Sequence, residues 1–256
     1  MPLTDTVALV TGASRGAGAA IARALGSRGA SVCVNYLQSA DKAEAVAADL
    51  NAGPGRAFAH QADVTDAEAV RQMVEAVVER YGRLDVIVNN ALPTYAFDPG
   101  APYTSLDTLT WDHVQAQLDG ALGGALNTVR AALPTFRQQG YGKVVNISTN
   151  LVYNPVVTYH DYTAAKAALI GLTRTMAAEL GPDGVRVNLV AGGLLQTTDA
   201  SAVTTPEVFE FVAQGTPLRQ TVTPEEFAEA VVFFASPMSD AVTGQSLAVD
   251  GGLTMP

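Results

Sequence analysis

Seven short runs of apolar and β-branched residues recur along the chain, and longer segments with helical periodicity separate most of them. The runs occupy residues 7–11, 31–35, 56–60, 85–90, 143–148, 186–191 and 246–250. Strands that are apolar on both faces and alternate with helices are typical of a parallel sheet covered by helices on both sides. The alternation continues from end to end without a low-complexity linker. We therefore expect a single α/β domain over residues 1–256, with a Rossmann-type doubly wound sheet of about seven strands.

Helix boundaries agree with this alternation. Thr65 with Glu68 predicts an N-cap and a capping box, and residues 223–226 (TPEE) repeat the device with proline at the first helical position. Thr205 before a proline predicts a third helix start, and Gly181 before a proline predicts the end of the long helix that begins near residue 162. We interpret the less regular segments, 92–109 and 192–222, as walls of a pocket, because both follow strands and ligands bind at the carboxyl ends of such strands.

The charge balance restricts the partners. The net charge is −10 and no basic cluster is present, which argues against nucleic acid or an anionic membrane surface as a partner. No apolar run reaches 18 residues, so we expect no transmembrane helix, and the first residues lack the pattern of a signal peptide. The one cysteine, Cys33, lies in an apolar run and is interpreted as a buried strand residue. These features predict a cytoplasmic protein, and the spacing of histidines, cysteine and carboxylates predicts no metal site.

A glycine-rich turn follows the first predicted strand and leads into a helix. Gly12, Gly16 and Gly18 lie in the stretch TGASRGAG, where glycines permit a tight turn and a close approach of backbone to a pyrophosphate. The helix that follows directs its N-terminus at the anion. This context predicts a dinucleotide site.

The end of the second predicted strand indicates which dinucleotide is bound. An acidic residue there would accept a hydrogen bond from the ribose 2′-hydroxyl and select NAD. The chain has Asn35 and Tyr36 at this place and no acid, and Arg15 in the glycine-rich turn can supply a cation for a 2′-phosphate. The prediction is therefore NADP(H).

Tyr162 and Lys166 are spaced to share one face of a helix, one turn apart. A tyrosine hydroxyl ordinarily has a pKa near 10, and a neighbouring ammonium should lower the pKa by favouring the phenolate. The same lysine can hydrogen-bond a ribose hydroxyl. The pair is thus expected to act as a proton shuttle beside a nicotinamide.

With these motifs in place, the chain resembles classical short-chain dehydrogenases/reductases along its length, and most of all the 3-oxoacyl-[acyl carrier protein] reductase type. The resemblance rests on residues 11–18, 63–64, 89–91 and 146–149, on the Tyr162–Lys166 pair, and on residues 242–252. It implies hydride transfer to a carbonyl with Tyr162, Lys166 and Thr149 as catalytic residues, and a homotetramer. The cofactor-binding set that it and the glycine-rich turn imply is Gly12, Ser14, Arg15, Gly16, Gly18, Asn35, Tyr36, Asp63, Val64, Asn89, Asn90, Ala91, Lys166, Gly193 and Thr197.

Four positions depart from the family pattern. Thr149 stands where serine is usual and keeps the hydroxyl, while the adjacent Ser148 is an alternative that a strand would turn to its other face. Where the family has an asparagine that supports a proton relay, this chain has Ala121 when counted back from Pro134, or Leu118 when counted forward from Trp111, and neither side chain can replace the amide. Leu92 replaces a glycine near the nicotinamide, and Gly192 replaces a proline, which predicts a more flexible turn.

The predicted pocket segments are apolar and aromatic, which favours a neutral, fairly bulky ketone or an acyl thioester as substrate. The residues expected to line it are Leu92, Tyr95, Tyr153, Tyr159 and Leu194. An alternative is a non-reductive enzyme, such as a dehydratase, isomerase or cyclase, on the same scaffold. A non-catalytic dinucleotide-binding regulator is a third hypothesis, against which the Tyr162–Lys166 pair argues.

Overall fold

A computed structural model describes residues 2–92, 95, 97–98, 100–196, 198, 201 and 204–256. Within these residues seven parallel strands form one sheet in the order β3-β2-β1-β4-β5-β6-β7. The strand order reverses between β1 and β4, and this switch point is where doubly wound sheets bind their ligands. In chain order the strands are β1 (Val7–Val10), β2 (Ser31–Tyr36), β3 (Arg56–Gln61), β4 (Val86–Asn89), β5 (Gly142–Thr149), β6 (Val185–Gly192) and β7 (Ser246–Val249). The predicted sheet and its seven strands are confirmed.

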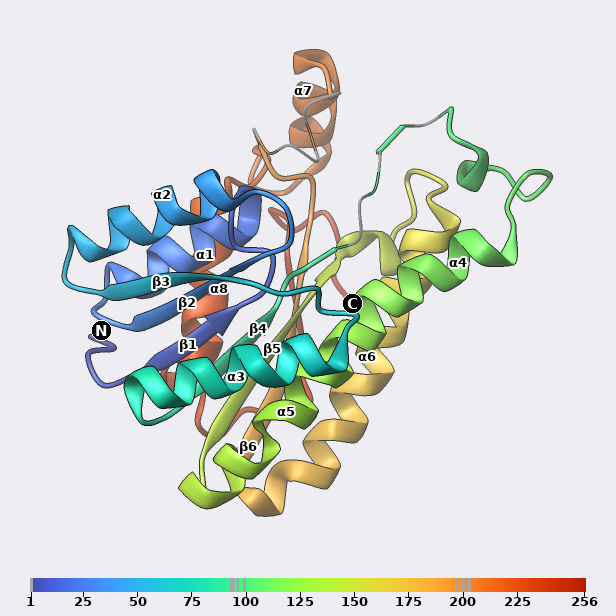
Figure 1. Ribbon diagram of the computed structural model, residues 1–256. Coiled ribbons are helices and arrows are strands. Elements are labelled where there is room, and N and C mark those ends of the chain that lie inside the picture. Colours follow the sequence, from blue (N-terminus) through green and yellow to red (C-terminus); the bar gives the residue numbers. More distant parts are fainter. Residues whose placement is uncertain are drawn as a thin grey trace.

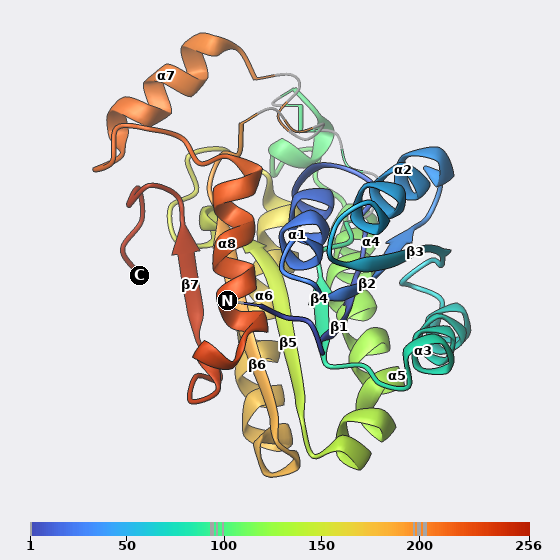
Figure 2. The same ribbon diagram turned by 90° about the vertical axis from the view of Figure 1, so that its left-hand side faces the viewer.

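Helices cover both faces of the sheet (Figure 1). One face carries α1 (Gly16–Gly26), α2 (Ala40–Asn51) and α8 (Pro224–Ala235), and the other carries α3 (Ala67–Tyr81), α5 (Gly124–Gln139) and α6 (His160–Leu180). The helix α4 (Trp111–Leu118) packs against α6, while α7 (Pro206–Gly215) has no buried residue and stands away from the sheet (Figure 2). The short 3-10 turns are Pro102–Thr104, Asn150–Val152, Gly181–Asp183 and Pro237–Ser239.

The two layers of core follow from strands that are apolar on both faces. Beneath α1, α2 and α8 the sheet contributes Val10 and Val34, which pack in one cluster with Ile21 and Phe227. On the opposite face the neighbouring strand position, Leu9, belongs to a second cluster that includes α3, α5 and α6 residues. Each large side chain that is fully buried contributes about 1.5–3 kcal/mol to folding. The alternation along β1 therefore binds both helical layers to one sheet.

The N-terminus of α3 differs by one residue from the prediction. Asp66, not Thr65, is the N-cap, and its carboxylate accepts hydrogen bonds from the backbone N–H groups of Glu68 and Ala69 at 2.9 and 3.1 Å. Thr65 instead donates its hydroxyl proton to Asp63 at 2.7 Å. A carboxylate is favoured at the positive end of the helix dipole, which explains why the aspartate takes the cap.

The other predicted helix boundaries are confirmed. Thr223 caps α8 in a capping box with Glu226, Thr205 is the N-cap of α7, and Gly181 is the C-cap of α6. Asp161 lies in the first turn of α6, where the helix dipole favours an acidic side chain.

The helical segment over residues 111–139 is interrupted. Between α4 and α5 the chain forms a π-helical turn, η2 (Asp119–Gly123), which contains Gly120 and Gly123 and is followed directly by Gly124. Turns of this kind occur mostly as single bulges within α-helices and are frequent at functional sites. The turn here contains Ala121, the position where the sequence departs from the family pattern.

Two buried groups serve the fold. Cys33 is fully buried as predicted, and burial raises the pKa of its thiol. Lys143 is also buried, and its ammonium donates to the backbone oxygen of Ser236 at 2.7 Å and to Ser239 Oγ at 2.9 Å, and pairs with Asp240 at 2.8 Å. It thus connects the start of β5 to the turn after α8. No helix among the described residues is both long and apolar enough to cross a membrane.

Candidate active site

The glycine-rich turn between β1 and α1 has the predicted geometry. Gly12 and Gly16 have φ of 62° and 55°, in the left-handed region that favours glycine. A Cβ on Gly18 would lie 2.3 Å from the backbone oxygen of Gly12, so no larger residue fits there. Arg15 is the N-cap of α1 and forms no side-chain capping bond, so the first N–H groups of the helix are not capped by it. The turn is therefore able to receive an anionic group.

Two asparagines hold this turn in place. Asn35 accepts a hydrogen bond from the backbone N–H of Gly12 at 3.1 Å, and its amide donates to the backbone oxygen of Ala62 at 3.0 Å. Asn90 donates to the backbone oxygens of Thr11 and Gly12 at 2.9 and 3.1 Å. Asn35 is buried and its side chain is fully engaged in hydrogen bonds, so it supports the turn from behind.

The other predicted cofactor residues border the same edge of the sheet. Ser14, Tyr36, Asp63, Val64 and Ala91 are half-buried, and Arg15 is exposed. The Asp63 carboxylate accepts from Thr65, and Asn89 bonds to Asn146 and Thr128 at 2.9 and 2.6 Å, which fixes the end of β4. Gly193 follows β6 and is closely packed, because a Cβ added to it would lie 2.6 Å from the Cβ of Asp250. Thr197 lies outside the described residues.

Tyr162, Lys166 and Thr149 converge at the start of α6 and the end of β5. Lys166 is buried and donates from Nζ to the backbone oxygen of Ile147 at 2.8 Å. Burial lowers the pKa of Lys166 to about 8. Burial also raises the pKa of Tyr162 to about 12, and a hydrogen bond with Thr149 acts against this rise.

The lysine was expected to lower the pKa of Tyr162, but in the structure this pKa is raised. The lysine amine is directed to a strand carbonyl and is itself poorly solvated, so loss of water around the phenol dominates. Tyr162 is a protonated phenol at neutral pH.

The two candidate hydroxyls are clearly separated. Ser148 donates to the backbone oxygen of Lys166 at 3.0 Å and is thereby occupied on the α6 side of the strand. Thr149, one residue on, is the hydroxyl beside Tyr162 and accepts from the N–H of Leu151 at 3.3 Å. Successive side chains of a strand point to opposite faces, which explains why Ser148 and Thr149 have different partners.

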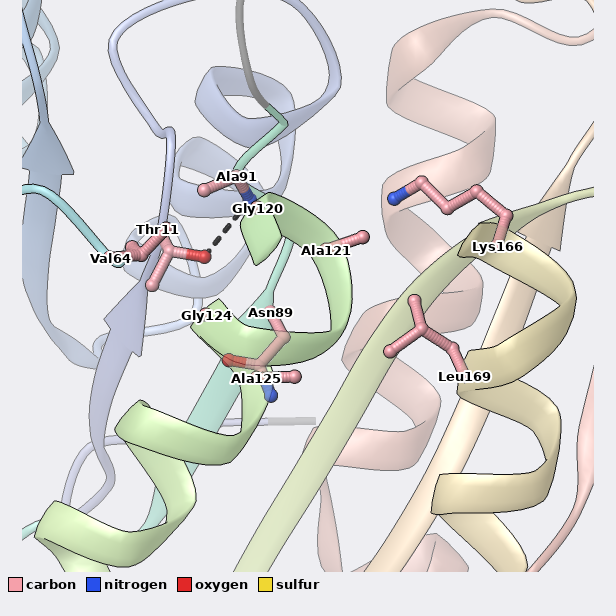
Figure 3. A pocket seen from close by; sticks show the side chains of 10 residues that line it. All are labelled: Thr11, Val64, Asn89, Ala91, Gly120, Ala121, Gly124, Ala125, Lys166 and Leu169. Atoms are coloured by element: carbon pink, nitrogen blue, oxygen red, sulfur yellow. Dashed lines mark hydrogen bonds between the residues drawn. The ribbon is translucent and has the colours of Figure 1, made fainter. Parts of the chain in front are cut away.

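A small cavity of about 10 Å³ lies where the π-helical turn faces Lys166. Figure 3 shows the lysine side chain directed across this space toward Ala91 and Gly120, with the methyl group of Ala121 beside it. A volume of this size corresponds to about one water molecule. Its lining consists of Thr11, Val64, Asn89, Ala91, Gly120, Ala121, Gly124, Ala125, Lys166 and Leu169.

Tyr162 belongs to a cluster of five aromatic rings. Tyr95 stacks on the Tyr162 ring with centroids 5.5 Å apart and an interplanar angle of 26°, and Phe97 meets the Tyr162 ring edge-on at 5.2 Å. Tyr103 and Tyr159 complete the cluster. The sequence singled out Tyr95 and Tyr159, but it missed Tyr103, which the high aromatic content of residues 95–103 could have indicated.

The remaining predicted pocket residues are placed less uniformly. Leu92 and Leu194 are half-buried after β4 and β6, while Tyr153 packs against the cluster that contains Ala121 and Leu169. A cavity of about 260 Å³ lies beside Tyr159, lined also by Thr104, Val156, Val157 and Thr158. This cavity is open to the surface.

Gly192 does not form the flexible turn that its sequence context predicted. It is the last residue of β6, and a Cβ there would lie 3.0 Å from the ring of Phe227. The missing side chain therefore allows α8 to pack closely on the strand.

Comparison with known proteins agrees with the geometry. Residues 12–254 match the family model described as enoyl-(acyl carrier protein) reductase. A 3-oxoacyl-[acyl-carrier-protein] reductase of Synechocystis sp. is 38% identical over 256 residues, which covers 99% of this chain and 98% of that protein. A 3-oxoacyl-[acyl-carrier-protein] reductase of Staphylococcus aureus is 38% identical and covers 97% and 98% of the two chains.

Solved structures give the same result. A short-chain dehydrogenase from Burkholderia cenocepacia in complex with NADP has a TM-score of 0.86 at 35% identity, covering 99% of each chain. A short-chain type dehydrogenase/reductase from Mycobacterium ulcerans has a TM-score of 0.90 at 28% identity, covering 99% of this chain and 91% of the other. With the glycine-rich turn, the Tyr162–Lys166 pair and the sheet order described above, the chain belongs to the short-chain dehydrogenase/reductase family.

Proposed function

We propose that this protein is an NADPH-dependent reductase that converts the carbonyl group of a small-molecule or acyl-thioester ketone to an alcohol. The observation that carries the proposal is the meeting of Tyr162, Thr149 and Lys166 at the carboxyl edge of the sheet, beside the glycine-rich turn. A bound nicotinamide would supply a hydride to the carbonyl carbon. The residues of the chain would hydrogen-bond the carbonyl oxygen and give it a proton.

The chemistry of the residues suits reduction. The phenol of Tyr162 holds its proton at neutral pH because burial raises its pKa to about 12. An alkoxide formed from a ketone is a stronger base than a phenolate, so the proton moves from Tyr162 to the developing alcohol oxygen. Thr149 supplies a hydroxyl donor to the same oxygen. Lys166 lies one helical turn away and, when protonated, stabilises the phenolate that remains.

The residues present fit a dinucleotide at this edge. The close approach at Gly18, the left-handed Gly12 and Gly16 and the start of α1 together form a turn that a pyrophosphate can approach. NADP(H) is proposed over NAD(H) because positions 35–37 carry no acid and Arg15 is exposed in the turn. The NADP complex of the Burkholderia cenocepacia relative supports this choice.

A panel of substrates tests the proposal. The purified protein is mixed with NADPH and, separately, with aryl ketones, 3-oxoacyl thioesters and enoyl thioesters, and NADPH absorbance and products are followed. Oxidation of NADPH with formation of the alcohol is the expected result. Product without NADPH oxidation would establish the dehydratase, isomerase or cyclase alternative, and NADPH binding without any product would establish the regulator.

The proposal includes a homotetramer in the cytoplasm, with no nucleic acid or membrane as partner. Support for assembly comes from the exposed face of α6, where Ala164, Ala167 and Gly171 leave a surface of small residues. A Cβ on Gly171 would contact nothing within 4 Å, so this helix face has room for another helix. The fully buried free thiol of Cys33 is compatible with a reducing compartment.

A further inference from the structure

Tyr95 is the ring that connects the aromatic cluster. Its centroid lies 4.9 Å from that of Phe97, 4.8 Å from that of Tyr103, 6.0 Å from that of Tyr159 and 5.5 Å from that of Tyr162. The stacked arrangement with Tyr162 covers one face of the phenol ring. Aromatic pairs at such separations stabilise one another beyond the area that they bury. Any motion of the Tyr95 ring therefore changes the surroundings of the Tyr162 phenol.

A buried carboxylate holds Tyr95 in this place. Tyr95 donates its hydroxyl proton to Asp161 Oδ1 at 2.9 Å, and the same oxygen accepts the backbone N–H of Tyr162 at 2.7 Å. Asp161 is 2% exposed, so water does not compete well for either bond. One oxygen atom thus joins the hydroxyl of Tyr95 to the backbone of Tyr162.

The same contacts join two distant segments. Tyr95 belongs to the segment after β4, and Asp161 to the first turn of α6. A second bond, from Thr158 Oγ1 to the backbone oxygen of Thr104 at 2.8 Å, holds these segments together farther along. The segment is therefore attached on both sides of the aromatic cluster.

We infer that Tyr95 is a positioning residue for the reaction, which sets the orientation and the dry surroundings of the Tyr162 phenol through its ring stack and its hydrogen bond to Asp161. This inference rests on the proposed function, because a phenol that donates a proton must be held in register with the carbonyl oxygen. A displacement of about 1 Å in such a group can cost about 10²-fold in rate.

The hydroxyl of Tyr95 is suited to this role. Burial, and next the hydrogen bond to Asp161, raise the pKa of Tyr95, so the group stays a donor across the pH range in which enzymes work. A hydrogen bond to a carboxylate is stronger than a neutral one. A phenylalanine at position 95 would keep the ring but lose this attachment.

Four variants test the inference. Tyr95→Phe removes only the hydroxyl, Asp161→Asn keeps an oxygen that can accept, and Asp161→Leu removes the acceptor. Tyr141→Phe makes the same chemical change in a half-buried tyrosine that immediately precedes β5. This tyrosine lies at the amino ends of the strands, away from the site at their carboxyl ends. For each protein, kcat, KM, NADPH affinity and the melting temperature are measured.

The expected result is a specific loss of turnover. Tyr95→Phe lowers kcat about 10-fold with NADPH affinity unchanged, Asp161→Asn stays within about 3-fold of the wild type, and Tyr141→Phe has no effect. In the Asp161→Leu background, Tyr95→Phe adds less than about 2-fold, because the two changes break one interaction. A kcat for Tyr95→Phe within about 2-fold of the wild type, or fully additive losses, would overturn the inference.

A second readout does not depend on turnover. The phenolate absorbance of Tyr162 is titrated as the difference between each protein and the same protein carrying Tyr162→Phe. Looser packing admits water, so Tyr95→Phe should move the Tyr162 pKa from about 12 toward its ordinary value of 10. If the wild type reduces no ketone, the proposed function fails, and this titration alone decides the inference: an unchanged pKa overturns it.

Discussion

The amine of Lys166 donates a hydrogen bond to the backbone oxygen of Ile147 at 2.8 Å. The bond attaches a buried, ionisable side chain of α6 to strand β5, at a residue two positions before Thr149. Because burial lowers the pKa of Lys166 to about 8, part of the population is uncharged at mildly alkaline pH in the protein without cofactor.

This buried amine should make stability depend on pH in a defined window. Between pH 8 and 10.5 the unfolded chain keeps a proton on Lys166 that the folded chain has released, so stability rises with pH there, and below pH 8 the full cost of burying the ammonium is present. Compared with Lys166→Met, the wild type should gain roughly 1–3 kcal/mol of unfolding free energy between pH 7 and 10.5. Chemical denaturation of both proteins without cofactor measures this, and parallel pH profiles would contradict it.

Tyr162→Phe should lower kcat for ketone reduction by about 10²–10⁴-fold, because the variant lacks the general acid. NADPH affinity should stay within about 2-fold, measured by fluorescence titration. Tyr141→Phe is the matched control, since it loses a hydroxyl far from the carboxyl edge. An unchanged rate in Tyr162→Phe would remove this tyrosine from the reaction and bring the non-reductive alternative to the front.

Ala121→Asn should change kcat by at most several-fold, and upward. The asparagine amide would enter the space beside Lys166, where a cavity of about 10 Å³ can hold about one water, and it would add a polar group to the path of the proton. The melting temperature should fall, since the added atoms exceed the cavity. Ala121→Leu fills the same space without a polar group, and an equal gain in kcat from leucine would refute the polar explanation.

Arg15→Ala should weaken NADPH binding about 10–100-fold and leave NADH binding nearly unchanged, because only NADPH carries the 2′-phosphate. Arg23→Ala is the matched control: it lies on the same helix, is exposed, and pairs with Asp49 at 2.9 Å. Titration of all three proteins with both cofactors checks this. Tighter NADH than NADPH binding in the wild type would reverse the cofactor assignment.

Light scattering should give a mass four times the 26.5 kDa of one chain. Gly171→Trp, on the exposed small-residue face of α6, should shift the mass toward smaller species, because a bulky ring prevents close helix packing there. Ala48→Trp, on the exposed face of α2, should leave the mass unchanged. A wild-type monomer at micromolar concentration would exclude the tetramer.

Most of the architecture could be predicted because it follows from local patterns. Each strand is an apolar run in the sequence. The glycines at positions 12, 16 and 18, directly after β1, have the spacing that the turn requires. The cap of α3 was missed by one residue because Thr65 and Asp66 can both cap, and only the three-dimensional bonds decide between them. The π-helical turn was missed because the spacing of DGALGG indicates a weak helix without specifying its hydrogen-bond pattern.

The site was less predictable because its parts act over long separations. The place of Asn35 at the end of β2 predicts a cofactor contact, but no local spacing indicates that its amide oxygen also accepts from the N–H of Gly12, 23 residues earlier. The bond between Tyr95 and Asp161 spans 66 residues, and no spacing rule connects them. The pKa of Tyr162 was expected to fall, and it rises, because its sign depends on burial, which a motif does not specify.

The π-helical turn η2 has a consequence for how this chain tolerates changes in length. A π turn holds one residue more than the α-helical turn that it replaces, so it is equivalent to a single-residue insertion within a continuous helix. Deleting one residue between Asp119 and Gly123 would restore regular α-helix and leave α4 and α5 nearly in their present rotation about the helix axis, whereas the same deletion within α5 would rotate one side of it by about 100°. The turn is therefore the place where this helix can lose one residue with the least change in which side chains face the site.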